Sequence, residues 1–256
     1  MQELLKIQQL KKYFKKNENV IRAVDDVDLS IMENEWVALI GESGSGKTTI
    51  ANIIAGFVLP DAGRFFYDGQ MVFDSEAAIQ PARGARRSIQ MVFQNARASF
   101  SNMFSVYHGI SEGINYYGNY SREEKRQKVE QAAEMVQLPK SCLSKKPSQI
   151  SGGECQRAAI ARAIISEPKL LICDEMTSAL DVCVQKDIMD LMVMLRKETG
   201  MAYLFISHDL ALVKNYADRV CVMRKGILEE TGSCRDIFAN PSSGYTRKLI
   251  DSAMSL

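Results

Sequence analysis

One stretch of sequence decides the fold of this chain: Gly41-Glu42-Ser43-Gly44-Ser45-Gly46-Lys47-Thr48-Thr49, which matches the pattern G-x-x-x-x-G-K-[ST]. The apolar run at 36–40 before it predicts a strand, and the apolar spacing within 48–57 predicts a helix. Glycines let successive backbone N–H groups turn inward, and the helix N-terminus adds its positive end. Together these features predict a loop that binds the phosphates of a nucleotide.

Within this loop, we expect Lys47 to reach the β- and γ-phosphates and the Thr48 hydroxyl to hold Mg²⁺. A dinucleotide site is excluded, because the glycines do not follow G-x-G-x-x-G and the loop carries a lysine. The sequence therefore predicts that a nucleoside triphosphate binds together with Mg²⁺.

The composition indicates a globular protein and excludes several other classes. The chain has 256 residues, 46% of them hydrophobic and 25% charged, with a formal net charge of +1. Such a balance gives no support for a protein that coats nucleic acid. No apolar stretch approaches the roughly 18 residues of a transmembrane helix, and no secretory signal is expected. The six scattered cysteines form no C-x-x-C pair, so we expect thiols in a reducing, cytosolic compartment.

Further apolar runs predict strands that are buried on both faces of a parallel sheet. They span residues 88–93, 169–174, 202–207 and 219–223. Between the second and third of them, residues 184–195 carry an apolar stripe at helical spacing. These alternating elements predict an α/β fold.

The segment 95–157 shows no strand pattern and is expected to be a helical insert. Its clearest helix, 121–138, opens with Ser121 and Glu124 as a capping box. We therefore divide the single domain 1–256 into a core of 1–94 and 158–226, the insert 95–157, and a C-terminal part 227–256. This last part is expected to complete a hairpin around Lys225-Gly226 and to end in a short tail.

An acidic pair follows the apolar run LLIC at 170–173. Ligands of open α/β sheets bind at the carboxyl ends of the strands, where Asp174 and Glu175 are expected to lie. Because side chains alternate along a strand, the two carboxylates are expected to differ in role. Asp174 is predicted to coordinate Mg²⁺, and Glu175 to act as general base toward water.

The stretch ISGGE at 150–154 resembles the L-S-G-G-Q signature of ATP-binding cassette (ABC) proteins. Gln94, the signature, the acidic pair, the run SALD at 178–181 and His208 follow the glycine loop in the order of that family. The resemblance implies a P-loop NTPase (RecA-like) core, an antiparallel N-terminal β-subdomain and an inserted helical subdomain. Ser151 and Glu154 also match a capping box, which is compatible with the signature.

The resemblance implies that two ATPase domains bind head to tail and enclose two ATP molecules with Mg²⁺. The residues implied to act across this interface are those of the signature and of the SALD run. They are Ser151, Gly152, Gly153, Glu154 and Asp181. Within one chain, Gln94 is implied to sense Mg²⁺ and water, and His208 to hold the γ-phosphate and the attacking water. Together with Glu175 and Lys47, these two residues make up the expected catalytic set.

An aromatic residue near the N-terminus is implied to stack on adenine. Tyr13 and Phe14 both qualify, and alignment on the strand pattern at 27–31 favours Phe14. Packing in the core is the alternative role for either ring. The lysines around them are expected to form a solvated, charged loop. They are Lys11, Lys12, Lys15 and Lys16.

Within the family, three runs resemble the importers of peptides, nickel and opine metallophores: residues 94–106, 177–188 and 240–250. The chain departs from the group at Ile150, Glu154 and Met176, and it lacks the cysteine-rich extension of some members, so no iron–sulfur cluster is expected. The implied function is the ATPase subunit of a bacterial importer at the cytoplasmic face of the membrane. Its implied partners are a second, different ATPase chain, two permeases and, indirectly, a solute-binding protein; no nucleic acid is expected.

Two alternatives stay open at this level. A DNA-maintenance or ribosome-associated ABC ATPase is disfavoured, because only about a hundred residues separate the loop from the signature and one cassette is present. A subunit that binds ATP without hydrolysing it is disfavoured by Glu175 and His208, although Met176 keeps that alternative open.

Overall fold

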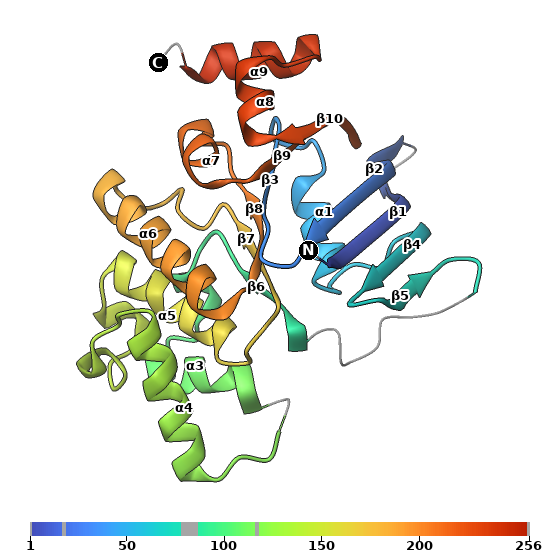
Figure 1. Cartoon of the computed structure of the whole chain (residues 1–256). Helices are drawn as coiled ribbons and strands as arrows, with labels where there is room; N and C mark the ends of the chain where they lie inside the picture. Colours follow the sequence, from blue (N-terminus) through green and yellow to red (C-terminus); the bar gives the residue numbers. More distant parts are fainter. Residues whose placement is uncertain (1, 17–18, 78–86, 116–117, 255–256) are drawn as a thin grey trace. The chain divides into compact units, whose positions relative to one another are not determined.

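The computed structural model describes residues 2–16, 19–77, 87–115 and 118–254. The chain forms two compact units (Figure 1). The first unit combines Met1–Arg86 with Ala202–Leu256, and the second is Arg87–Met201.

An antiparallel sheet forms the N-terminal part of the first unit. Its strands lie in the order β2-β1-β4-β5. They are β1 (Glu3–Lys16), β2 (Asn19–Met32), β4 (Ala62–Tyr67) and β5 (Gln70–Asp74). Leu5 lies opposite both Ile31 and Tyr67, and all three side chains are buried. These buried side chains give the sheet an apolar face.

The expectation of a lysine-rich loop at residues 11–16 is wrong, because these residues belong to β1 and pair with β2 as far as Lys16 and Asn19. Two ion pairs lie along this charged run. Lys11 lies 3.7 Å from Asp26, and Lys12 lies 2.8 Å from Asp61.

Parallel strands form the second layer of the first unit. β3 (Trp36–Ile40) lies between β8 (Ala202–Ile206) and β9 (Arg219–Arg224), parallel to both. All five residues of β3 and of β8 are buried, as expected for strands covered on both faces. The ring of Trp36 lies 4.7 Å from that of Tyr203. This apolar sheet carries the glycine loop directly after β3.

The expected hairpin is confirmed between β9 and β10 (Ile227–Ser233), with Arg224 opposite Ile227. Lys225 and Gly226 have φ of 47° and 89°, the left-handed backbone of a tight two-residue turn.

The short tail expected after this hairpin contains two helices, α8 (Cys234–Ala239) and α9 (Gly244–Met254), beside β10 (Figure 1). A six-residue helix such as α8 is too short to show a helical period. The N-terminus of α9 is held by residues of β10, which no local pattern reveals. A third short helix, α7 (Leu210–Tyr216), precedes β9.

The second unit pairs two parallel strands with helices. Its strands are β6 (Ile89–Val92) and β7 (Leu170–Asp174). Its helices are α3 (Val106–Asn115), α4 (Arg122–Met135), α5 (Gly152–Ile164) and α6 (Val182–Thr199), with 3₁₀ turns at Arg97–Ser99, Lys140–Cys142 and Pro147–Gln149. The described residues between 95 and 157 are helices, turns and loops without a strand. The capping box of Ser121 and Glu124 is confirmed at the start of α4.

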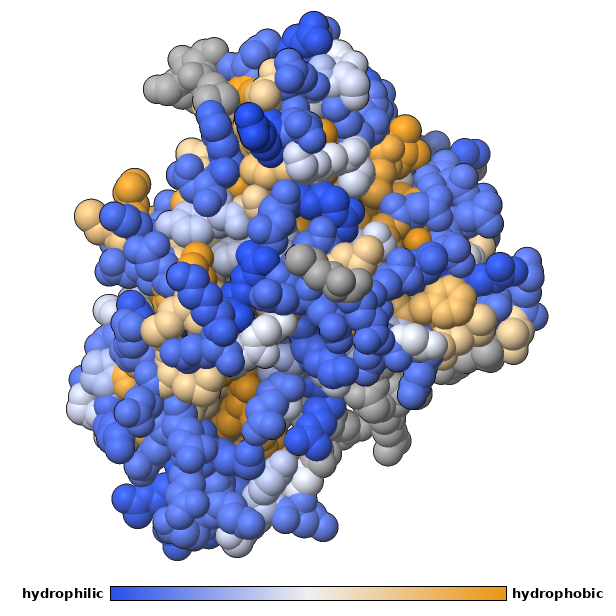
Figure 2. Space-filling view, in the orientation of Figure 1, coloured by the Kyte–Doolittle hydropathy of each residue, from blue (hydrophilic) through white to orange (hydrophobic). Residues whose placement is uncertain are grey.

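The surface seen in Figure 2 is mostly hydrophilic, with apolar residues in small separate groups. Among the residues described, no helix combines the length and the apolar character needed to cross a membrane. The parallel strands with their helices and the additional antiparallel sheet confirm the expected α/β fold class.

Candidate functional site

The glycine loop lies between β3 and α1 (Lys47–Ile54) and uses backbone conformations that favour glycine. Gly41, Gly44 and Gly46 have φ of 145°, 78° and 112°. A Cβ atom on Gly46 would lie 2.0 Å from the carbonyl oxygen of Ala23, and one on Gly41 would lie 2.1 Å from that of Met223. Glycines at 41 and 46 therefore let the loop pass close to neighbouring backbone.

The residues of this loop fit a bound triphosphate. Lys47 is only 6% exposed, and its ammonium donates to the carbonyl oxygens of Gly41 and Glu42, both at 2.8 Å. Among the described residues, no side chain caps the N-terminus of α1, where Gly46 is the N-cap. Because no side chain caps the helix start, its N–H groups can donate hydrogen bonds to an anion. The buried ammonium of Lys47 adds a positive charge beside them.

Asp174 and Glu175 lie at the end of β7, as expected, but their geometry differs from the prediction. Asp174 is the last strand residue and is buried, with 8% exposed. Strand alternation does not apply to this pair, because β7 ends at Asp174, and different roles for the two carboxylates stay a prediction. Glu175 has φ of 48°, so a left-handed backbone sets the direction of its side chain.

The structure brings Gln94 and Glu175 together, although they lie 81 residues apart. Gln94 Nε2 donates to Glu175 Oε2 at 2.9 Å and lies 3.4 Å from Ser178 Oγ. The Ser178 hydroxyl in turn donates to the backbone oxygen of Glu175 at 2.9 Å. Ser178 was not expected to contribute, and the only sequence signal for this contact is its i+3 spacing from Glu175. These bonds hold the carboxylate beside the amide that was expected to sense water.

The residues expected to bind Mg²⁺ are Thr48, Gln94 and Asp174. They offer a hydroxyl, an amide and one carboxylate, all of them oxygen donors. Mg²⁺ usually keeps several waters and binds through one or two carboxylates together with substrate phosphates. The donor set therefore fits an ion that is bound jointly by protein and nucleotide.

The signature residues form the capped N-terminus of α5. Ser151 Oγ accepts from the Glu154 N–H at 3.2 Å, and Glu154 Oε2 accepts from the Ser151 N–H at 2.7 Å, so the predicted capping box is confirmed. The bond from the Ser151 N–H lowers the pKa of Glu154. The Cys142 thiol, whose pKa is raised by burial, donates to Glu154 Oε1 at 3.3 Å. Gly152 remains exposed beside exposed Ser151, so the tip of α5 can contact a second molecule.

His208 and Asp181 both lie where a strand or loop passes into a helix. Ser207 Oγ accepts from the Asp209 N–H at 3.0 Å, and Asp209 caps α7 by accepting from Leu212 at 3.1 Å. These bonds shape the turn that presents the exposed His208. Asp181 caps α6 by accepting from the Val184 N–H at 3.0 Å, a structural role that adds to its expected contact with a partner.

The two candidate aromatic residues differ in their surroundings. The Tyr13 hydroxyl donates to Asp25, which raises the pKa of Tyr13, and the Arg22 guanidinium lies 5.8 Å from its ring. The Phe14 ring is 40% exposed, with the Lys12 ammonium 5.4 Å away. Neighbouring strand residues face opposite sides, so the two rings cannot stack on the same base. The exposed ring of Phe14 is the better candidate.

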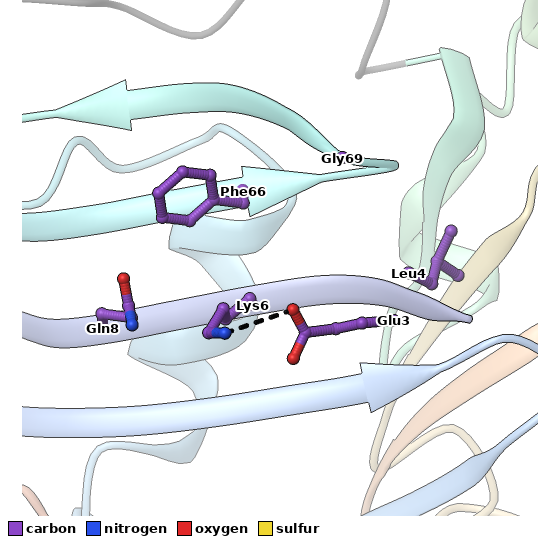
Figure 3. Close-up of a pocket in the computed structure, with 6 residues that line it drawn as sticks. All are labelled: Glu3, Leu4, Lys6, Gln8, Phe66 and Gly69. Atoms are coloured by element: carbon purple, nitrogen blue, oxygen red, sulfur yellow. Dashed lines mark ion pairs between the residues drawn. The ribbon is translucent and has the colours of Figure 1, made fainter. Parts of the chain in front are cut away.

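A hollow of about 270 Å³ on the antiparallel sheet is a separate feature of the first unit (Figure 3). It is lined by Glu3, Leu4, Lys6, Gln8, Phe66 and Gly69. Its ion pair, Lys6 to Glu3 at 3.5 Å, is solvent-exposed on both sides, and such pairs contribute little. This lining lacks the glycine-rich backbone of a triphosphate site.

The carboxylate of Glu230 on β10 holds the N-terminus of α9. It accepts from the backbone N–H groups of Ser242 at 2.7 Å and of Ser243 at 3.1 Å. Burial alone would raise the pKa of Glu230, but bonds from the Ser242 hydroxyl and from these N–H groups lower it to about 2. Sequence reasoning missed this contact, which joins residues twelve positions apart.

Acid is expected to destabilise the docking of α9. Because the folded-state pKa of Glu230 lies below its usual value of about 4.3, its stabilisation is complete above that value and disappears as the pH falls to about 2. We expect a contribution of about 1 kcal/mol, discounted for exposure to solvent. Urea unfolding at several pH values should show a flatter acid limb for Glu230→Gln than for Glu76→Gln, a surface control that pairs with Arg64. Equal acid limbs would contradict this role.

Several known proteins resemble this chain in sequence. The ABC transporter family model matches residues 24–178. The oligopeptide transport ATP-binding protein OppF of Lactococcus lactis subsp. lactis (strain IL1403) is 38% identical, over 100% of this chain and 82% of that protein. OppF of Escherichia coli (strain K12) is 39% identical over 94% of this chain and 72% of that protein.

A solved structure also matches. The ATP-binding cassette MJ0796, in a dimeric post-hydrolysis state bound to ADP and Pi, aligns with a TM-score of 0.79 and 30% identity. The alignment covers 91% of this chain and 99% of that one. Since the family model matches more than half of the residues and the relatives align along nearly the whole length, the chain belongs to the ABC transporter family and is an ATPase.

Proposed function

We propose that the chain is the ATPase subunit of a bacterial importer that takes up peptides through separate membrane permeases. One observation carries the choice of cargo class. Relatives named as oligopeptide transport ATP-binding proteins align with 94% and 100% of this chain at 39% and 38% identity. The glycine loop and the Gln94–Glu175 pair supply the features that ATP hydrolysis requires.

ATP binding begins at the glycine loop. The Lys47 ammonium exchanges its bonds to the Gly41 and Glu42 carbonyl oxygens for bonds to the β- and γ-phosphates. The first N–H groups of α1 donate hydrogen bonds to phosphate oxygens, and the exposed ring of Phe14 stacks on adenine. When bound by Thr48, Gln94 and Asp174, Mg²⁺ supplies charge neutralisation at the phosphates.

Hydrolysis depends on Glu175, which takes a proton from the attacking water as general base. Gln94, already bonded to Glu175 Oε2, orients that water, and His208 holds the γ-phosphate. Met176, which differs from the residue usual in the family at this position, is 1% exposed, so its side chain packs in the core. The carboxylate of Glu175 beside it is bonded to Gln94.

The exposed tip of α5 serves a second cassette. Ser151 and Gly152 contact the γ-phosphate bound to the loop of the partner, and Asp181 contacts the partner chain. The related cassette MJ0796 has been solved as a dimer, which supports this arrangement. We propose a heterodimer with a different ATPase chain at the cytoplasmic face of the membrane, where two permeases bind and receive cargo from a solute-binding protein.

Uptake measurements in the organism that carries the gene test this function. Deleting the gene is expected to reduce the uptake of a radiolabelled oligopeptide to background, while uptake of radiolabelled nickel stays unchanged. The wild-type gene and the surface variant Glu167→Gln should restore peptide uptake, whereas Glu175→Gln should not. Unchanged peptide uptake in the deletion strain, or loss of nickel uptake alone, would contradict the proposal.

A further inference from the structure

The start of α9 contacts the glycine loop through Tyr245. The Tyr245 hydroxyl accepts a hydrogen bond from the backbone N–H of Glu42 at 3.2 Å. The Arg224 guanidinium lies 4.7 Å from the centre of the Tyr245 ring. We infer that Tyr245 is a positioning residue for nucleotide binding, which acts by holding Glu42 at the beginning of the phosphate loop.

Tyr245 is itself held in place by two glutamates in the middle of β10, Glu229 and Glu230. Glu230 binds the N–H groups of Ser242 and Ser243. The Ser243 hydroxyl donates to Glu229 at 3.0 Å and accepts from the Tyr245 N–H at 3.1 Å. Further along α9, Ile250 is 6% exposed and anchors the helix by burial. These contacts fix the first turn of α9, and thereby the position from which the Tyr245 hydroxyl binds the loop.

The β9–β10 hairpin makes a second contact with the same loop. The Gly226 N–H, in the turn of the β9–β10 hairpin, donates to the backbone oxygen of Ser45 at 2.9 Å. Gly41 passes so close to Met223 that a Cβ atom would lie 2.1 Å from its carbonyl oxygen. The hairpin therefore contacts the loop at Gly41 and at Ser45, and the residues between these two positions are exposed. Tyr245 binds this exposed stretch at Glu42, directly after Gly41.

The expected consequence is a change in nucleotide affinity rather than in the chemical step. Without the bond to Glu42, the loop is less ordered before ATP binds. Part of the binding free energy of ATP is then used to order the loop, and the affinity for ATP falls. An interaction that serves the ground state and the transition state equally raises KM when it is lost and leaves kcat unchanged. A single hydrogen bond of this kind corresponds to a change of about 3- to 10-fold.

The test replaces the hydroxyl alone. Tyr245→Phe keeps the ring beside Arg224 but removes the acceptor for Glu42. Tyr120→Phe is the matched control, because Tyr120 lies in the second unit and also has a cation, Lys128, 5.6 Å from its ring. We expect KM for ATP to rise about 3- to 10-fold in the first variant and to stay within about twofold in the second, with kcat within about twofold in both.

A second measurement needs neither ATP nor turnover. Hydrogen–deuterium exchange of the Glu42 amide in the nucleotide-free chain is expected to be about 3- to 10-fold faster in Tyr245→Phe than in wild type. Equal exchange at Glu42 and an equal KM would overturn the inference. A lower thermal midpoint with unchanged KM would also overturn it, because Tyr245 would then only stabilise the fold. Since exchange is measured without nucleotide, its outcome does not depend on whether the chain serves a peptide importer.

Discussion

Replacing Glu175 with glutamine is expected to lower ATP turnover by at least about 100-fold while ATP still binds. Gln94 Nε2 donates to Glu175 Oε2 at 2.9 Å, and a glutamine side chain keeps an oxygen that can accept this bond. The variant therefore preserves the shape and the hydrogen bond of the site but cannot take a proton from water. Steady-state turnover and equilibrium ATP binding, measured on the same preparation, separate the two steps.

Glu167→Gln is the matched control for this variant. Glu167 is another glutamate of the second unit with positive φ, 57° against 48° for Glu175, and it pairs with Lys128 at 3.1 Å. Removing its charge should change turnover by no more than about twofold. If Glu175→Gln retained turnover within about tenfold of wild type, the assignment of Glu175 as general base would be wrong.

Replacing Gly46 with alanine is expected to weaken ATP binding by about 100-fold or more. The new Cβ atom would lie 2.0 Å from the carbonyl oxygen of Ala23, at a residue whose φ of 112° already disfavours any side chain. Strain of this kind costs on the order of 1–3 kcal/mol before the collision with backbone is added. Relieving it displaces the N–H groups at the start of α1 that are expected to bind phosphate. Titration with a fluorescent ATP analogue measures the loss.

Gly69→Ala distinguishes loss of the site from loss of the fold. Gly69 belongs to the same unit and has φ of 72°, but a Cβ atom there would meet nothing within 4 Å. This control should carry a comparable backbone strain and keep ATP affinity within about twofold. Thermal unfolding followed through Trp36, the single tryptophan of the chain, checks that both variants are folded. Equal affinities of Gly46→Ala and wild type would contradict the role of this glycine.

Local sequence patterns predicted those parts of the fold that depend on residues close together in the chain. Ser151 and Glu154 form the predicted capping box, because a helix start is completed within four residues. The turn at Lys225-Gly226 was predicted for the same reason. By contrast, side-chain composition predicts a loop for the lysine-rich run, because it does not reveal the hydrogen bonds that pair this run with β2.

The direction of Glu175 shows the limit of a periodic argument. Alternation predicts where a side chain points only while the strand continues, and β7 ends at Asp174. The residue after the strand adopts a left-handed backbone, held by the bonds from the N–H and hydroxyl of Ser178 to the Glu175 carbonyl. The acidic pair could be found from the sequence, but the orientation of its second member could not.

By itself, the sequence determined that this chain carries a phosphate-binding loop after a buried strand and an acidic pair after another. Both are recognised from short patterns, because the glycines and apolar residues in them favour one local backbone structure. Only the tertiary structure decided that Gln94 binds Glu175 and that Tyr245 binds Glu42, at separations of 81 and 203 residues. Such contacts arise when distant segments pack together, and no local spacing encodes them, which is why a tyrosine in the expected tail emerged as a contact of the glycine loop.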